Sequence, residues 1–285
     1  MSRNRDRTGG APSVAPQAEP PVNQIMNNNE SQHPFSFVVP TEFVALPSEG
    51  KYYPPGHPLH NQPNIEIKQM TAKEEDILTS QSLLKQGVAL DRVLQSIIVD
   101  HRINVGSLLV GDRNALLVAC RVSGYGSDYA TKVTCPACGT AQDYTFDLNS
   151  LEVEHGGILE NVVRNSDGTF TTVLPKSKLS ATFRLLTAND EKDLERFKTK
   201  NNNKRDRLIT GTLRSILVEI EDNDTPEALN YVVENIPSMD SAHIRRCYRE
   251  VAPDLNMKQF FECGECSHTQ DLEVPLTADF FWPNT

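Results

Sequence analysis

Basic residues and long apolar runs are both scarce in this sequence. Of its 285 residues, 28 are Lys or Arg and 38 are Asp or Glu, which gives a formal net charge of −10 at pH 7. A polyphosphate is a poor partner for such a surface, which argues against nucleic-acid binding. No run approaches the ~20 apolar residues that cross a bilayer, so we expect no transmembrane segment. The opening MSRNRDRTGGAPSV has no apolar stretch after its basic residues, so we expect no secretory signal and a reducing cytoplasm.

The sequence also lacks the common catalytic motifs. It contains no HExxH, no GxxxxGK[ST], no GxSxG and no GxGxxG, the patterns of zinc peptidases, phosphate-binding loops, hydrolase nucleophiles and dinucleotide sites. The acidic runs at residues 74–76 and 190–191 fall in the first turns of predicted helices, where negative charge complements the helix dipole. We therefore expect a protein that is not an enzyme.

The composition changes along the chain. Residues 1–34 are rich in Pro and Asn and poor in large apolar side chains, which predicts a disordered tail. From Phe35 a proline-interrupted, β-prone stretch predicts irregular β structure. A strand over residues 65–67 then leads to Thr71, three residues before Glu74, a spacing that predicts a capping box at a helix start. Apolar residues at three- and four-residue spacing predict further helices over residues 90–99 and 112–122.

The same order of features occurs twice. TAKEEDIL at Thr71 matches TANDEKDL at Thr187, VALPSEGK matches TVLPKSK, and CPACGTAQDYTFDL matches CGECSHTQDLEVPL. The offset from Cys135 to Cys263 equals the offset from Asp112 to Asp240. The offset between the two threonines is shorter, so the second copy carries extra residues, which we place within EDNDTPEALNYVVENIP.

Repeated order at fixed spacing predicts an internal duplication. We predict an α+β fold of two similar halves, each with strands, helices and a cysteine hairpin, packed about a pseudo-twofold axis. In this division residues 1–34 are the tail, 35–150 the first repeat and 151–285 the second.

Two C-x-x-C pairs point to a metal. A C-x-x-C turn directs two thiolates toward one ion, and zinc takes four ligands in a tetrahedron. One pair cannot fill that shell, so we predict that Cys135, Cys138, Cys263 and Cys266 together bind one Zn²⁺, each pair at the tip of a hairpin. A closed shell of four cysteines leaves no position for a reacting water, so the predicted zinc is structural. Whether the pairs meet within one chain or across a dimer stays open.

Other interpretations of the cysteines and histidines are weaker. A redox dithiol also uses C-x-x-C, but neither pair stands between a strand and a helix, which favours metal. His268 follows Cys266 closely, yet its counterpart is Thr140, so we interpret it as a surface residue. Cys120 and Cys247 lie on predicted helices and are expected to be small buried hydrophobes.

Two tyrosine stretches and one basic stretch allow two interpretations each. Tyr52 and Tyr53 in LPSEGKYYP, and Tyr125 in RVSGYGSDY, either cover the edge of the core or anchor a protein partner. The basic residues around Lys204 form either a solvated loop between helices, which we favour, or a nucleic-acid patch. A patch beside the cysteines would favour the alternative function, a zinc-ribbon nucleic-acid-binding protein or transcription factor.

The succession of LPSEGKYYP, MTAKEEDIL, GDRNALLVACRVSGYG and TCPACG resembles the baseplate hub assembly proteins of T-even-type contractile-tailed bacteriophages. The resemblance covers residues 46–148 and extends more weakly over the second repeat. It implies a protein that helps to build the baseplate hub through contacts with hub, tail tube or tape-measure proteins, without known enzymatic chemistry. The implied location is the virion tail baseplate or the cytoplasm of the infected bacterium, and the implied role is either a transient assembly factor or a permanent component. The family pattern centres on one C-x-x-C unit, so two pairs are a departure from it.

Overall fold

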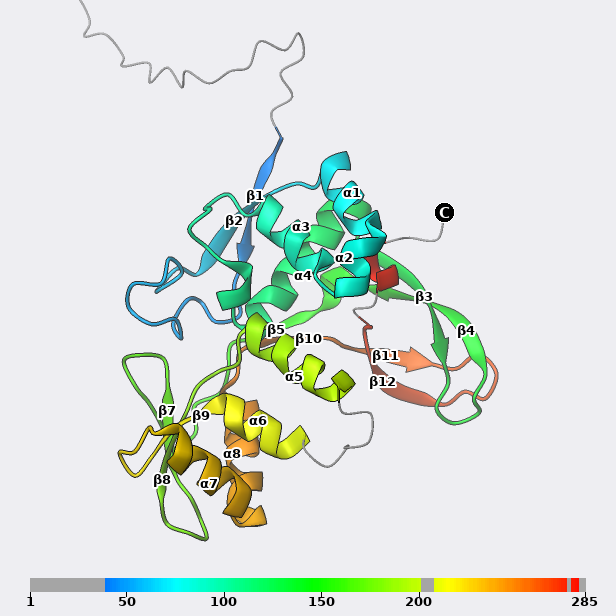
Figure 1. The fold of residues 1–285 in the computed structure, drawn as a ribbon. Coiled ribbons are helices and arrows are strands. Elements are labelled where there is room, and N and C mark those ends of the chain that lie inside the picture. The colour runs from blue at the N-terminus through cyan, green and yellow to red at the C-terminus, as the bar shows by residue number, and fades with distance from the viewer. Residues whose placement is uncertain (1–38, 201–207, 276–277, 282–285) are drawn as a thin grey trace, which may run out of the picture. The chain divides into compact units, whose positions relative to one another are not determined.

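The computed structural model describes residues 39–200, 208–275 and 278–281, and the predicted tail, residues 1–34, lies outside them. From residue 39 onward the chain clusters as one compact unit. Its elements are short helices and small antiparallel sheets (Figure 1), which confirms the predicted α+β class.

The first elements are a hairpin followed by helices. In chain order they are β1 (Thr41–Ala45), β2 (Asn64–Lys68), α1 (Ala72–Thr79), α2 (Gln81–Gln86), α3 (Ala89–Ile97) and α4 (Val110–Tyr125). β2 alternates as predicted and buries Ile65 and Ile67. α1 begins at the predicted capping box, in which the Thr71 N–H and hydroxyl both donate to the Glu74 carboxylate, at 3.0 and 2.6 Å. The helices predicted over residues 90–99 and 112–122 correspond to α3 and α4.

The second group of elements forms a four-stranded sheet with helices. They are β6 (Val162–Arg164), β7 (Phe170–Val173), β8 (Ser180–Phe183), α5 (Ala188–Lys200), α6 (Leu208–Ile216), β9 (Leu217–Ile220), α7 (Pro226–Asn235) and α8 (Ser238–Val251). The sheet order is β6-β7-β8-β9, all antiparallel. α5 begins at Thr187, whose N–H and hydroxyl donate to the Asp190 carboxylate at 2.8 and 2.7 Å.

Two long hairpins, a small sheet and short 3₁₀ turns complete the fold. β3 (Asp128–Thr134) pairs with β4 (Ala141–Asp147), and β11 (Lys258–Glu262) with β12 (Thr269–Glu273). β5 (Glu152–Glu154) pairs with β10 (Asp254–Asn256), which packs against α4. Short 3₁₀ turns lie at Val105–Ser107, Leu148–Ser150 and Ala278–Phe281. The main apolar core is continuous from β2 and α3 through α4 to the four-stranded sheet and α8.

Two buried aspartates each hold a turn that follows a strand. Asp112, in the first turn of α4, accepts hydrogen bonds from the N–H and hydroxyl of Ser48 at 2.9 and 2.6 Å. Asp240, in the first turn of α8, accepts the N–H groups of Lys176 and Ser177 at 2.7 and 2.9 Å. Burial raises the pKa of Asp112. Burial acts in the same direction on Asp240, but the hydrogen bonds from Lys176 and Ser177 outweigh it and lower the pKa of that carboxyl.

We expect Asp240→Asn to lower the free energy of unfolding at pH 7 by about 1–3 kcal/mol, because one of two buried N–H donors loses its acceptor. The folded-state pKa of Asp240 lies below its usual value. The stabilisation is therefore present above the unfolded pKa of about 3.9 and disappears as the pH falls through the folded pKa. Urea unfolding should show that the wild type and Asp240→Asn differ at pH 7 and converge only at a pH below the folded pKa of Asp240. Asp224→Asn, at an exposed position, is the control, and an equal loss there would contradict the prediction.

Candidate metal centre

Each cysteine pair lies at the tip of a hairpin, in a turn built by backbone hydrogen bonds. In the first, the Cys135 N–H donates to the Thr140 carbonyl and the Gly139 N–H to the Cys135 carbonyl, both at 2.9 Å. In the second, the Cys263 N–H donates to the His268 carbonyl and the Ser267 N–H to the Cys263 carbonyl, again both at 2.9 Å. The residue after the second cysteine has a positive φ in both turns. The local sequence thus directs both sulfurs of each pair to one side.

The two turns meet, so the four sulfurs form one cluster. Cys135 Sγ lies 3.8 Å from Cys266 Sγ, and Cys138 Sγ lies 3.8 Å from Cys263 Sγ. All four sulfurs lie within 4.8 Å of one another. A tetrahedral ion with Zn–S bonds of ~2.3 Å separates its sulfurs by about 3.8 Å, so the donor set fits zinc. A disulfide needs about 2.05 Å, and all six cysteines are free.

The cluster has an apolar inner side. Cys135 and Cys263 are buried, and Cys138 and Cys266 are exposed. The buried pair packs with Phe261 in a small apolar cluster that Val133, Tyr144 and Leu272 flank. A bound ion would therefore be shielded on one side only.

Hydrogen bonds also join the two hairpins directly. The Tyr144 hydroxyl donates to the Phe260 carbonyl at 2.6 Å, and the Gly264 N–H donates to the Gln142 side chain at 3.0 Å. The hairpins lie side by side in Figure 1. Segments far apart in the chain therefore form one small unit around the sulfurs.

The thiols of the cluster ionise unequally. The Thr140 hydroxyl, 3.4 Å from the Cys138 sulfur, lowers the pKa of the Cys138 thiol to about 6. For Cys266 the backbone N–H of His268 lowers the pKa, but desolvation and the neighbouring cysteines outweigh it and raise the pKa to about 12. A divalent cation is the partner that stabilises all four groups as thiolates together.

The remaining cysteines and His268 stay outside this cluster. His268 is half-buried with its Nε2 3.2 Å from the Gln270 side-chain oxygen. Cys120 and Cys247 are each 1% exposed within the main core, as expected for small hydrophobes. Burial raises the pKa of both thiols, that of Cys120 to about 12.

The three candidate tyrosines differ in how far their side chains are buried. Tyr53 is only 2% exposed, and its hydroxyl donates to Asp112 at 2.7 Å, so its ring lies in the core and is not open to a partner. Tyr52 is half-buried with its ring centroid 5.6 Å from that of Phe170. Tyr125 is half-buried at the end of α4 and donates to Glu75 at 3.1 Å. A protein-binding role for Tyr52 and Tyr125 stays a prediction.

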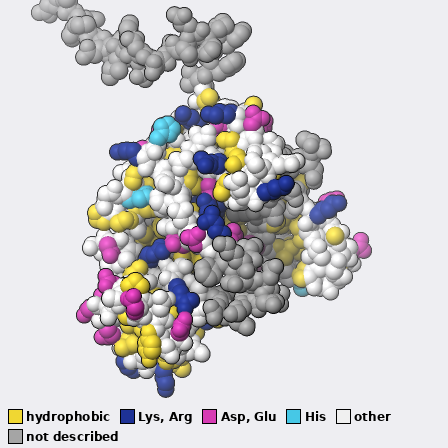
Figure 2. All heavy atoms as spheres, in the orientation of Figure 1, with side chains coloured by type: hydrophobic (Ala, Val, Ile, Leu, Met, Phe, Trp, Pro, Cys, Tyr) yellow, Lys and Arg dark blue, Asp and Glu magenta, His cyan; other side chains and the backbone are white. Residues whose placement is uncertain are grey.

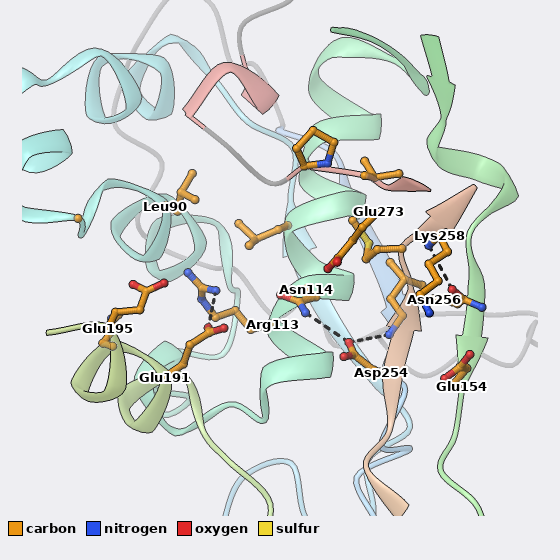
Figure 3. Close-up of a pocket in the computed structure, with 17 residues that line it drawn as sticks. Leu90, Arg113, Asn114, Glu154, Glu191, Glu195, Asp254, Asn256, Lys258 and Glu273 are labelled. Atoms are coloured by element: carbon orange, nitrogen blue, oxygen red, sulfur yellow. Dashed lines mark hydrogen bonds and ion pairs between the residues drawn. The ribbon is translucent and has the colours of Figure 1, made fainter. Parts of the chain in front are cut away.

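A polar cavity of about 800 Å³ lies where α4 faces α5 and β10. Figure 3 shows Arg113 directed toward Glu191, and Asn114 toward Asp254. Arg113 also forms an ion pair of 2.9 Å with the buried carboxylate of Asp91. The described lining is net acidic, with five acidic residues against three basic ones: Glu154, Glu191, Glu195, Asp254 and Glu273 against Arg113, Lys192 and Lys258. No sequence pattern indicated this cavity, because its walls come from distant segments.

Among the described residues, no helix is long and apolar enough to span a membrane. On the face drawn in Figure 2, acidic and basic side chains are interspersed, and the coloured side chains form no broad basic area.

Comparison with known proteins identifies one family. No match was found among curated proteins or among solved structures. A family model described as T4 bacteriophage base plate protein matches residues 39–282, which span both cysteine hairpins. Because the match covers most of the chain, the protein belongs to the T4 bacteriophage base plate protein family.

Proposed function

We propose that this protein is a structural or assembly component of the phage baseplate hub that acts through protein–protein contacts, with one structural zinc ion at Cys135, Cys138, Cys263 and Cys266. The observation that carries the proposal is the convergence of four sulfurs, from hairpins in the two halves of the sequence, in a chain of the baseplate family. The zinc fixes the two hairpins against each other. We propose that the protein is not an enzyme, and its membership of a baseplate family supports this.

We also propose that the chain is an internal duplication, with repeats at residues 35–150 and 151–285 related by a pseudo-twofold axis. Equivalent contacts in the two repeats support this. Asp112 and Asp240 hold corresponding turns, and the two cysteine turns have the same hydrogen bonds. The pairing of Val44 with Ile65 corresponds to that of Thr172 with Ala181. The extra residues of the second copy coincide with α7.

The proposed partners are hub, tail tube or tape-measure proteins, in the virion baseplate or in the cytoplasm of the infected bacterium. Exposed acidic residues outnumber basic ones on the cysteine hairpins, which opposes nucleic-acid binding there: Asp128, Asp143, Asp147, Glu262, Glu265, Asp271 and Glu273 against Lys132 and Lys258. The nucleic-acid alternative depends on the basic stretch near Lys204, and residues 201–207 lie outside the described part of the chain. A pull-down from infected cells should recover a tail protein, and recovery of none would contradict the proposed role.

Native mass spectrometry of the full chain tests the metal site. We expect one zinc ion per chain, because four thiolates complete one tetrahedral shell. The double variant Cys138→Ser and Cys266→Ser should carry no zinc, whereas Cys120→Ser, which changes a cysteine outside the cluster, should keep it. Purified wild-type protein that is folded and free of zinc would contradict the proposal.

A further inference from the structure

A pocket of about 390 Å³ lies between α6 and α8 (Figure 1). Its described lining comes from these two helices alone and contains two arginines, an aromatic ring and no carboxylate: Thr212, Ile216, Ala242, Arg245, Tyr248 and Arg249. Concave sites with apolar walls and a few charged groups are typical of ligand sites. We call this site the arginine pocket.

The two arginines of the pocket lack a carboxylate partner. Arg245 is half-buried and Arg249 is exposed. They stand four residues apart on α8, so their like charges lie on one face of the helix and repel each other. Arg245 donates to the Ser241 carbonyl of its own helix at 3.3 Å, and neither guanidinium forms an ion pair within the described part of the chain. By contrast, Arg184 and Arg214 each pair with a carboxylate at 2.7 Å. The pocket therefore keeps guanidinium donors for an anion.

The walls of the pocket supply an apolar surface beside these charges. Ile216 of α6 is fully buried. Tyr248 is half-buried, and its hydroxyl accepts the Leu186 N–H at 3.3 Å, which holds the ring in place. Ala242 is exposed, and its small side chain leaves room above the helix. Arginine and tyrosine around such a space are the residue types that dominate the binding energy of protein interfaces.

The corresponding arginine of the first half shows what a guanidinium at this helix position binds. Arg121 of α4 precedes Arg249 by the offset that relates the two cysteine pairs, so this comparison uses the proposed duplication. The Arg121 guanidinium donates to three carbonyls, one of them from Phe280, whose ring packs against Tyr129. The segment that covers it is the 3₁₀ turn Ala278–Phe281, which contains an aspartate and two phenylalanines. Among the described residues, Arg249 has no such oxygen acceptors.

We propose that the arginine pocket binds an acidic side chain of a partner protein, an Asp or Glu carboxylate that stands next to an aromatic residue. The carboxylate accepts hydrogen bonds from Arg245 and Arg249, because a guanidinium matches the two oxygens of a carboxylate. The aromatic residue packs against Tyr248 over Ala242. A net charge of −10 on the whole chain disfavours a polyphosphate as the occupant. The inference rests on the proposed role in protein–protein contacts and does not depend on zinc.

NMR titration of the full zinc-loaded chain tests the pocket. The probe is the peptide acetyl-EEFEE-amide, and acetyl-QQFQQ-amide is the uncharged peptide of the same size. We expect the acidic peptide to shift the side-chain Nε–H signals of Arg245 and Arg249, and the neutral peptide to leave them in place. The double variant Arg245→Gln and Arg249→Gln, followed at the Ala242 amide signal, should bind the acidic peptide about tenfold more weakly or worse. Lys73→Gln with Arg92→Gln removes the same charge from exposed helix positions outside the pocket and should bind as the wild type does.

A steric variant separates the pocket from general charge attraction. Ala242→Trp fills the space without changing the charge and should weaken binding of the acidic peptide about tenfold as well. Circular dichroism and zinc content establish that each variant is folded. Arginine signals that do not respond to the acidic peptide would overturn the inference, as would equal binding of the neutral peptide or an equal loss in the Lys73 and Arg92 variant.

A nucleic-acid probe tests the choice of partner. A single-stranded DNA oligonucleotide that shifts the two arginine signals at a lower concentration than the acidic peptide, at the same ionic strength, would overturn an acidic protein as the occupant. The pull-down described above separates this inference from the proposed function. Recovery of a tail protein by a chain whose arginine pocket binds no acidic peptide would contradict the inference alone, and the zinc content is unaffected by either result.

Discussion

Cys263→Ser is expected to lower the free energy of unfolding by several kcal/mol, because the binding energy of a structural zinc ion is part of the folding energy. In a chain of this size the loss corresponds to a fall in Tm of about 10 °C. Cys263 is 1% exposed and lies 3.8 Å from Cys138 across the two hairpins. Its loss would leave three thiolates and a gap beside Phe261. Thermal unfolding followed by circular dichroism, with and without a chelator, measures the effect.

The chelator separates loss of metal from loss of packing. It should lower the Tm of the wild type toward that of Cys263→Ser and leave the variant almost unchanged. Cys120→Ala is the control, since Cys120 is equally buried but lies outside the cluster. Whatever that substitution does to packing, the Tm of Cys120→Ala should still fall on chelation. A wild-type Tm that does not respond to the chelator would contradict a stabilising metal.

Phe280→Ala is expected to lower the free energy of unfolding by about 3–5 kcal/mol, the cost of removing a large aromatic side chain from a packed core. Phe280 and Phe281 are each 1% exposed. The Phe280 ring meets Tyr129 edge to face, at a centroid distance of 5.1 Å. Its carbonyl accepts a hydrogen bond of 2.7 Å from the buried guanidinium of Arg121. Chemical denaturation at equilibrium measures the loss.

Phe260→Ala is the matched control for this prediction. Phe260 is 60% exposed, so its truncation should change stability by less than about 0.5 kcal/mol. Equal losses at the two positions would contradict the assignment of Phe280 to the core. Arg121→Met should also destabilise the protein, because it leaves three carbonyl groups, those of Phe280, Gly126 and Asp128, without their donor.

Several local features were predictable because they depend on neighbours in the chain. The capping boxes at Thr71 and Thr187 form as their three-residue spacing predicts, since donor and acceptor lie within one helical turn. The C-x-x-C spacing predicted two sulfurs on one side of a hairpin tip. The β-prone runs around each pair predicted the hairpins.

Arg121 and Tyr53 show what the sequence could not indicate. Arg121 lies on α4 and is fully buried, although no local sequence pattern indicates this. Three carbonyls, one of them from Phe280 at the far end of the chain, satisfy its guanidinium. Tyr53 in a glycine-flanked turn reads as a possible surface anchor, but its hydroxyl is bound to Asp112 in the core. No local pattern identifies a partner so distant in the sequence.

By itself the sequence determined the α+β class, the capped helices, the cysteine hairpins and the order of motifs that resembles a baseplate family. Only the tertiary structure decided that Cys135 and Cys138 meet Cys263 and Cys266 within one chain. The physical reason is how far apart in the sequence the interacting residues lie. Caps, turns and strand alternation arise from side chains a few residues apart, whereas the meeting of two hairpins depends on how the whole core packs between them.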